Sequence, residues 1–171
     1  MNRLPKIGLA VAVIFLIVDQ AVKLWVTGPL GLHNLGDLRY VAPIFNFQYV
    51  ANRGVSLGLL HADTETMRWS LVALTGVIAA GVLYWMFNEK NRQDQFALGM
   101  VLGGALGNII DRVRLGYVID YADLHFGEWR PFLVFNLGDA FITMGVLVLL
   151  VRALLVRDKS RARASVENSN A

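Results

Sequence analysis

Asp120 and Asp139 are the two residues of this sequence whose type and position best suit catalysis. Each lies at the end of a long apolar stretch, within the segment from Gly103 to Ala140. Two carboxylates held close together in a partly apolar site cannot both ionise, so they share one proton near neutral pH. One of them can then activate water as a base while the other acts as an acid toward a carbonyl group. The pattern predicts hydrolysis of an amide bond by an aspartic mechanism.

Other hydrolytic chemistries lack their usual residues. The chain has no cysteine, which excludes a thiol nucleophile and a thiolate metal site. It contains no HExxH zinc pattern, and no serine lies in the segment 103–140. The histidines His33, His61 and His125 have no metal-ligand spacing and are expected to be ordinary surface or interfacial residues. We therefore expect a site without a metal and without a cofactor.

The composition indicates a membrane protein. Apolar residues make up 56% of the 171 residues, and the mean hydropathy is +0.49. A helix that crosses a bilayer needs about 20 apolar residues, and four stretches qualify, at 7–26, 68–87, 96–114 and 137–156. Residues 27–66 contain aromatic and β-branched residues in partial alternation, which predicts a small β-structure at the membrane surface. The expected fold is a mainly α membrane protein with four transmembrane helices and a small periplasmic β-structure.

The length of the chain favours one domain. We expect a single integral-membrane domain over residues 1–157, followed by a basic, disordered tail over residues 158–171. Within the third predicted span, Gly99, Gly103 and Gly107 fall four residues apart and form one stripe. Such a stripe lets a neighbouring helix approach closely.

The distribution of basic residues predicts the orientation in the membrane. The C-terminal tail contains Arg157, Lys159, Arg161 and Arg163. Because positively charged segments stay on the cytoplasmic side, both termini are expected in the cytoplasm, as an even number of spans requires. The net charge of +3 is small and concentrated at the chain ends, which suits an anionic membrane face better than a nucleic-acid groove.

Polar residues of different predicted spans lie at a similar depth. At about 1.5 Å per helical residue, Asp19, Asn108 and Asp139 lie roughly 20 to 27 Å from the cytoplasmic ends of their helices. Ionisable groups inside a membrane are costly and normally face a protein interior with partners. Their convergence near the outer surface therefore argues for a functional site.

Each of these polar residues also has a purely structural interpretation. Asp139 lies three residues after Asn136, and the two could simply cap the start of a helix. Asp19 and Lys23 are four residues apart and could form an intrahelical ion pair. A buried hydrogen-bonding framework is the corresponding interpretation for one face of the third span, which carries Gly104, Asn108 and Arg112, with Asp111 beside them.

Several motifs, taken in order along the chain, resemble one known family. They are Asp19-Gln20 with Lys23, the run Asn52-Arg53-Gly54-Val55-Ser56, the sequence GGALGNIIDRVRLGYVID and the sequence FNLGDA. The last two are long and specific, and together the motifs resemble the bacterial lipoprotein signal peptidases (signal peptidase II). The resemblance implies an inner-membrane aspartyl endopeptidase with four spans and a site that faces the periplasm. Its implied substrates are prolipoproteins whose cysteine already carries diacylglyceryl.

The resemblance also implies roles for individual residues. Asp120 and Asp139 match the catalytic pair. Supporting or substrate-binding roles are implied for Asp19, Lys23, Asn52, Arg53, Gly54, Gly104, Asn108, Arg112, Asn136 and Ala140. Arg53 and Gly138 depart from the usual pattern, which has a small residue and an alanine there, but neither change removes a catalytic atom. The implied partners are lipidated precursors, membrane lipids and globomycin-type inhibitors, with no nucleic acid, and we expect a monomer.

Two other classes of function fit the same membrane pattern. Intramembrane Asp and Arg residues also occur in proton- or ion-coupled transporters, although the sequence has neither an inverted repeat nor a broken helix to support that class. In a non-catalytic membrane subunit, the polar residues would only hold helices together. Cleavage of a lipidated precursor by the purified protein would separate these classes.

Overall fold

All four predicted spans form helices. The computed structural model describes residues 4–54 and 65–169. In these ranges, the helices long and apolar enough to cross a membrane are α1 (Lys6–Thr27), α2 (Glu65–Asn88), α3 (Arg92–Leu115) and α4 (Leu137–Ser169). Their boundaries lie within a few residues of the predicted ones, except at the end of α4. The prediction of four spans is therefore confirmed.

Helix α3 is the centre of the bundle. It contacts each of the other three helices. In its 18-residue apolar segment 61% of the residues are buried, against 22% or less in the corresponding segments of the other helices. The glycine stripe explains how α1 packs so closely against it: a Cβ at Gly99 or Gly103 would lie 2.6 Å from the backbone oxygens of Gly8 and Ala12, respectively. A Cβ at Gly107 would overlap the carboxylate of Asp19. The predicted close approach along the stripe is confirmed.

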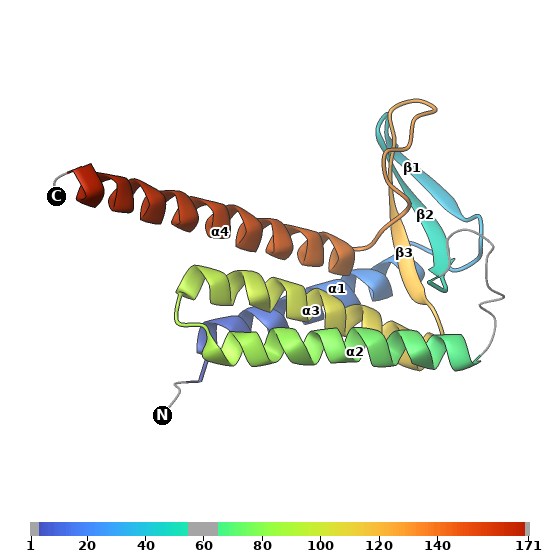
Figure 1. The fold of residues 1–171 in the computed structure, drawn as a ribbon. Helices are drawn as coiled ribbons and strands as arrows, with labels where there is room; N and C mark the ends of the chain where they lie inside the picture. Colours follow the sequence, from blue (N-terminus) through green and yellow to red (C-terminus); the bar gives the residue numbers. More distant parts are fainter. Residues whose placement is uncertain (1–3, 55–64, 170–171) are drawn as a thin grey trace.

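A three-stranded antiparallel sheet stands at one end of the bundle (Figure 1). Its order is β1 (Leu38–Ala42), β2 (Phe45–Asn52) and β3 (Val118–Leu124). The first two strands confirm the β-structure predicted within 27–66, whereas β3 was not predicted. Its sequence, VIDYADL, is buried on both faces of the sheet, so its buried positions do not alternate with exposed ones.

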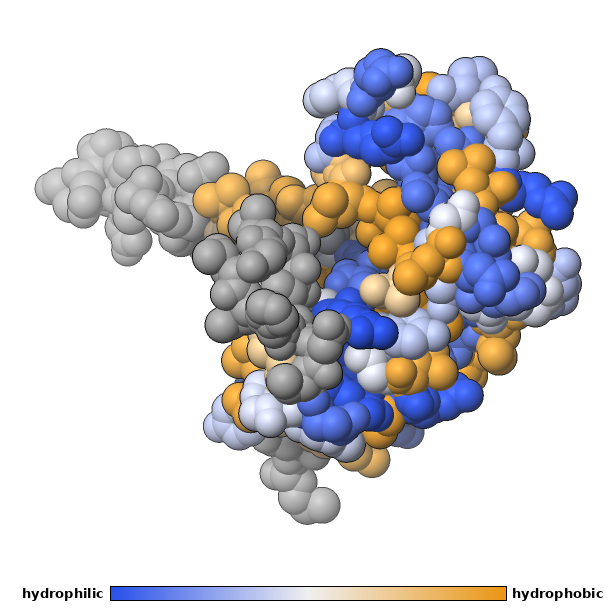
Figure 2. Space-filling view, turned by 90° about the vertical axis from the view of Figure 1, so that its right-hand side faces the viewer, coloured by the Kyte–Doolittle hydropathy of each residue, from blue (hydrophilic) through white to orange (hydrophobic). Residues whose placement is uncertain are grey.

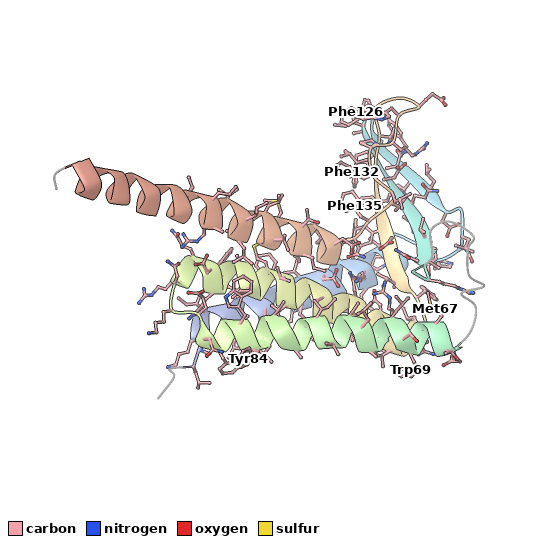
Figure 3. All side chains as sticks on the ribbon, in the orientation of Figure 1. Met67, Trp69, Tyr84, Phe126, Phe132 and Phe135 are labelled. Atoms are coloured by element: carbon pink, nitrogen blue, oxygen red, sulfur yellow. The ribbon has the colours of Figure 1, made fainter. Side chains whose placement is uncertain are left out.

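Residues 135–136 run beside β3 just before α4 begins. Phe135 forms an isolated bridge with Ala122, in which the Phe135 nitrogen donates to the Ala122 oxygen at 3.1 Å and the Ala122 nitrogen donates back at 2.7 Å. Phe126, Phe132 and Phe135 follow this connection from the tip of the sheet toward α4 (Figure 3). The bridge brings the first turn of α4 alongside the strand that carries Asp120.

A glycine and an arginine fix the junction between α3 and β3. Gly116 ends α3 in the left-handed conformation, with φ +85°. Arg68 of α2 donates from its Nε to the backbone oxygen of Arg112 at 2.7 Å and also contacts the backbone oxygen of Val113. These bonds satisfy carbonyl groups that the last turn of a helix leaves free.

The two ends of the described chain both lie at the side of the molecule away from the sheet. Figure 1 shows the start of α1 and the end of α4 at one end of the molecule, with the sheet at the other. Seen from the sheet end, hydrophilic and hydrophobic residues are interspersed, as at a boundary between lipid and water (Figure 2). Along α2, the exposed aromatic residues Trp69 and Tyr84 lie toward opposite ends of the helix (Figure 3).

The C-terminal tail corrects one prediction. We expected disorder over residues 158–171, but α4 continues without a break to Ser169. The segment RDKSRARASVE contains no Gly or Pro, and its Arg, Lys, Ala and Glu residues favour helix. Charge and polarity alone therefore did not indicate where the helix ends.

Candidate active site

Asp120 is buried in the middle of β3. It lies opposite Val50 in the sheet, and 1% of the residue is exposed. Its Oδ2 accepts a hydrogen bond from Asn52 Nδ2 at 2.8 Å, and its Oδ1 accepts one from Asn136 Nδ2 at 2.6 Å. The pKa of Asp120 is raised to about 6: burial is the largest cause and the nearby Asp139 also raises it, while the two amides and Lys23 oppose the shift. This carboxyl group can therefore hold a proton close to neutral pH.

Asp139 lies in the first turn of α4. The backbone nitrogen of Asn136 donates to its Oδ2 at 3.2 Å, and the backbone nitrogen of Asp139 donates to Asn136 Oδ1 at 3.0 Å. These reciprocal bonds form a capping box, so the capping interpretation of the pair is geometrically correct. Asp139 has a further contact, because its Oδ1 accepts a hydrogen bond from Asn108 Nδ2 of α3 at 2.9 Å.

Asn136 connects the two aspartates. Its amide nitrogen donates to Asp120, and its amide oxygen and backbone nitrogen bind Asp139. The residue is fully buried. Because the bridge between Phe135 and Ala122 holds it beside β3, the strand and the helix each present one carboxylate to the same asparagine.

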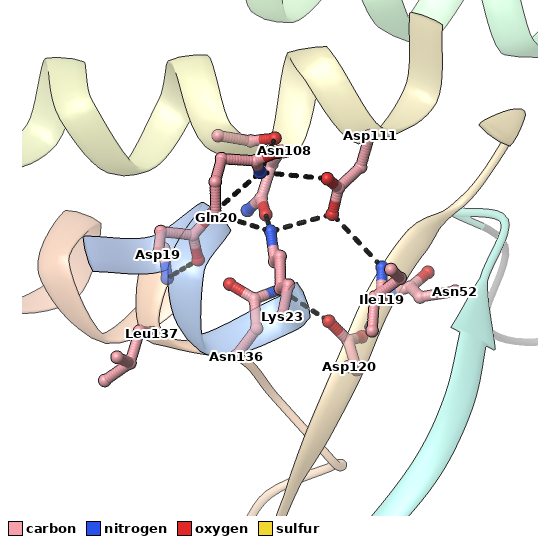
Figure 4. Close-up of polar contacts among 12 residues, drawn as sticks. Asp19, Gln20, Lys23, Asn52, Asn108, Asp111, Ile119, Asp120, Asn136 and Leu137 are labelled. Atoms are coloured by element: carbon pink, nitrogen blue, oxygen red, sulfur yellow. Dashed lines mark hydrogen bonds and ion pairs between the residues drawn. The ribbon is translucent and has the colours of Figure 1, made fainter. Parts of the chain in front are cut away.

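A buried charged cluster centred on Lys23 lies beside Asp120 (Figure 4). The ammonium of Lys23 lies 2.8 Å from Asp19 Oδ2 and 2.8 Å from Asp111 Oδ2. It also donates to Asn108 Oδ1 at 3.0 Å. The predicted intrahelical pair between Asp19 and Lys23 is therefore confirmed, but it is one part of a larger cluster. Gln20 completes that cluster by donating to Asp111 Oδ1 at 3.0 Å.

Asn52 owes its orientation to a glycine. The backbone nitrogen of Gly54 donates to Asn52 Oδ1 at 2.8 Å, which leaves the amide nitrogen of Asn52 to face Asp120. Gly54 has φ +85°, a conformation that residues with a side chain rarely adopt, and a Cβ there would overlap Leu71. Arg53, between the two, is exposed.

Arg112 is half-buried near the aspartates and interacts electrostatically with Asp120, Asp139 and Asp111. Among the described residues, no hydrogen-bond partner is present for its buried Nε. Gly104 lets α4 approach, because a Cβ there would overlap the backbone oxygen of Gly138. Ala140 is half-buried, and its nitrogen donates to the backbone oxygen of Asn136 at 3.2 Å.

Three residues of this network were not among the predicted site residues. Gln20 and Asp111 belong to the motifs of the sequence, but only proximity in space reveals their contact with Lys23. Tyr121 accepts a hydrogen bond on its hydroxyl group from the backbone nitrogen of Leu137 at 3.1 Å, and burial raises its pKa. A tyrosine directly after Asp120 was the available signal. In the described ranges, no three His, Cys, Asp or Glu side chains are grouped as metal ligands.

Comparison with known proteins accounts for this arrangement. The sequence profile of the family described as Signal peptidase (SPase) II matches residues 11–155. The chain belongs to the signal peptidase II family. Membership makes it a peptidase of the aspartic class, as predicted, and gives no support to the transporter alternative.

Two curated relatives support membership in the signal peptidase II family, and two solved structures share the fold. A lipoprotein signal peptidase of Sphingopyxis alaskensis is 48% identical over 155 residues, which cover 91% of this chain and 89% of the relative. One of Rhizorhabdus wittichii is 52% identical over 152 residues, which cover 89% and 88%. Two structures described as a bacterial membrane enzyme superpose with TM-scores of 0.72 and 0.74, at 27% and 28% identity. The first match covers 90% of both chains, and the second covers 86% of this chain and 92% of the other.

Proposed function

We propose that Asp120 and Asp139 are the catalytic pair with which this signal peptidase hydrolyses the signal-peptide bond of lipoprotein precursors. The observation that carries the proposal is their shared asparagine, since Asn136 hydrogen-bonds to both carboxylates at the junction of β3 and α4. A pKa of about 6 at Asp120 lets this carboxyl group carry a proton close to neutral pH, and two neighbouring carboxyl groups can share a single proton. This division of roles is what aspartic hydrolysis requires.

The reaction follows from that division. The ionised carboxylate takes a proton from water, and the water oxygen forms a bond to the scissile carbonyl carbon. The protonated carboxyl group gives its proton to the carbonyl oxygen. The tetrahedral intermediate then breaks its carbon–nitrogen bond, and the proton taken from water passes to the leaving nitrogen. One hydroxyl group of the intermediate returns its proton to the other carboxylate, which leaves the carboxylic acid product and restores the starting protonation state. We assign the supporting residues to holding this geometry, and Arg112 adds a positive charge near both carboxylates.

Replacing each aspartate by asparagine tests the proposal. Asp120→Asn and Asp139→Asn keep the side-chain volume and remove the ionisable group, so each should lower kcat by about 10²–10⁴-fold. The double variant should lose little more, because the two groups act as a unit. The control is Asp123→Asn, which changes an equally buried aspartate of the same strand. Substantial turnover by Asp139→Asn, or its failure only through unfolding, would reduce Asp139 to a capping residue.

The substrates that fit this assignment are prolipoproteins with a diacylglyceryl group on the cysteine. The site lies at the end of the bundle that carries the sheet, where an acyl chain can stay in the bilayer, and each buried CH₂ contributes about 0.8 kcal/mol. A membrane-embedded precursor without the lipid should therefore be cleaved far more slowly. Equal rates would contradict recognition of the lipid. Membrane lipids and globomycin-type inhibitors are further expected ligands of the same region.

The orientation that we propose places both termini in the cytoplasm and the site toward the periplasm, in the bacterial inner membrane. The common end of α1 and α4 and the positive charges from Arg157 to Arg163 support it. We treat residues 1–157 as one peptidase domain that acts as a monomer. Reporter fusions at residue 90 and after residue 160 should be cytoplasmic, and fusions near residues 35 and 127 periplasmic. A periplasmic C-terminus would refute this orientation.

A further inference from the structure

Lys23 lies between two buried carboxylates that come from different helices. Its ammonium is 2.8 Å from Asp19 Oδ2 on α1 and 2.8 Å from Asp111 Oδ2 on α3. All three side chains are at most 3% exposed. With two carboxylates and one ammonium, the cluster has a formal net charge of −1. Such a cluster is weak evidence for stability, because an apolar replacement of similar volume is often as stable or more so.

Each of these carboxylates also binds the backbone directly before one of the proposed catalytic aspartates. Asp19 Oδ1 accepts a hydrogen bond from the nitrogen of Gly138 at 2.8 Å, one residue before Asp139. Asp111 Oδ2 accepts one from the nitrogen of Ile119 at 3.3 Å, one residue before Asp120. The two contacts are equivalent, although α4 and β3 have no sequence in common. Lys23 therefore links the backbone of one aspartate to the backbone of the other through two carboxylates.

A third contact connects the same lysine to a catalytic side chain. Lys23 donates to Asn108 Oδ1 at 3.0 Å, and Asn108 donates to Asp139 Oδ1 at 2.9 Å. A single ammonium thus acts on Asp139 through both its backbone and its carboxylate. No other lysine among the described residues forms such contacts with two buried carboxylates.

We propose that Asp19, Lys23 and Asp111 form a positioning clamp that sets the separation and relative orientation of Asp120 and Asp139. None of the three needs to touch the substrate. Their effect on turnover comes through the amide groups of Gly138 and Ile119. The inference rests on the proposed catalytic role of the two aspartates.

Asp111 is the position at which the clamp can be opened with the smallest effect on the fold. Its removal leaves Asp19 and Lys23 as a one-to-one ion pair, so the formal charge of the cluster becomes balanced. Asp111→Leu removes both the contact with Lys23 and the contact with Ile119. Asp111→Asn keeps one oxygen that can still accept from the Ile119 nitrogen. The matched controls are Asp123→Leu and Asp123→Asn, at a fully buried aspartate three residues from Asp120.

The experiment measures kcat, KM and melting temperature in detergent with a diacylglyceryl-modified precursor. We expect Asp111→Leu to lower kcat by about 10²-fold, since a displacement of about 1 Å at a reacting group has that effect. KM should stay within about threefold of the unmodified value, because the substrate contacts remain. The kcat of Asp111→Asn should lie between that of Asp111→Leu and that of the unmodified chain. An Asp123 variant whose melting temperature is similar to that of the corresponding Asp111 variant should keep its kcat.

Three results would overturn the clamp. The first is a kcat for Asp111→Leu within about threefold of that of the unmodified chain. The second is a change in KM with no change in kcat. The third is a kcat loss no larger than that of Asp123→Leu when both variants lose the same amount of melting temperature. If Asp111→Leu does not fold, the test uses Asp111→Asn instead. A kcat of Asp111→Asn equal to that of Asp123→Asn would then refute the clamp. Failure of the catalytic proposal gives a different result, because Asp120→Asn would then retain turnover.

Discussion

The ammonium of Lys23 lies 3.0 Å from Oδ1 of Asn108 and determines which end of that amide faces Asp139. An ammonium group has three donors and no acceptor, so only the amide oxygen can face it. The amide nitrogen of Asn108 is thereby directed to Asp139 Oδ1, at 2.9 Å. Gly54 does the same for Asn52, since its backbone nitrogen binds the amide oxygen and turns the nitrogen toward Asp120. Each proposed catalytic carboxylate thus accepts a hydrogen bond from an asparagine amide whose oxygen is bound by another group on its far side.

The first prediction tests the orientation of Asn108. Asn108→Asp keeps an oxygen for Lys23 but replaces the N–H donor that faces Asp139 with a second oxygen. The variant loses a hydrogen bond and places two acceptors opposite each other, so turnover should fall by about tenfold or more. Turnover and melting temperature would be measured together. Asn88→Asp at the exposed end of α2 is the control, and equal turnover of the two variants would contradict this role for Asn108.

The second prediction concerns the pH dependence of stability. Because the pKa of Asp120 is raised from 3.8 to about 6, the folded state binds a proton that the unfolded state releases between these values. Its contribution to stability is therefore fully present below about pH 4 and is lost as the pH rises through 6. The difference amounts to about 3 kcal/mol at most. The charged groups that face Asp120 are Asp139 on α4, Lys23 on α1 and Arg112 on α3.

Melting curves of Asp120→Asn and of the unmodified chain between pH 4 and pH 7.5 would measure this effect. The variant has no carboxyl group to ionise at this position, so its stability relative to the unmodified chain should rise with pH and level off above pH 6. A relative stability that is constant over the whole range would show that the pKa of Asp120 is close to its ordinary value.

The third prediction concerns metal removal. Two carboxylates supply both the base and the acid of the proposed reaction, so no step needs a divalent ion. We expect detergent-solubilised enzyme to cleave a diacylglyceryl-modified precursor at the same rate before and after treatment with EDTA. Loss of activity on chelation, with recovery on addition of a divalent ion, would contradict the mechanism.

The fourth prediction tests the glycine stripe between α1 and α3. The Cβ of Gly103→Ala would lie 2.6 Å from the backbone oxygen of Ala12, so the helices must separate. Overpacking of this kind costs about 1–3 kcal/mol, and the melting temperature should fall. Gly76→Ala on α2 is the matched control, because beyond its own turn of helix no described atom lies within 4 Å of the added Cβ, and alanine favours helix by about 1 kcal/mol. Equal melting temperatures of the two variants would contradict the packing role of the glycine stripe.

The sequence predicted the features that depend on long uniform patterns. The four helices follow from apolar stretches of sufficient length, and the approach of α1 to α3 follows from glycines spaced four residues apart. The candidate aspartates stand out because carboxylates are rare at such depths in a membrane protein. Motif resemblance added Asn52, Asn108 and Asn136, which hydrogen-bond to Asp120 and Asp139.

Features that depend on contacts between distant segments were not predictable in this way. Strand β3 is buried on both faces, so no alternation marks it as a strand. The pairing of Lys23 with Asp111 joins two helices whose relative rotation the sequence does not specify. The direction in which an asparagine amide points depends on a neighbour such as Gly54 or Lys23, which is known only once the chain is folded.

The reciprocal bonds of Asn136 make the first turn of α4 part of the proposed catalytic site. The atoms of Asn136 that cap the helix also bind Asp139, and its amide nitrogen holds Asp120. If that turn frays, both carboxylates lose their common partner in the same event. Inactivation by heat is then a local opening at one end of α4, which requires less energy than unfolding of the whole bundle. We therefore expect the temperature at which activity is lost to follow the stability of this single turn and not that of the four helices.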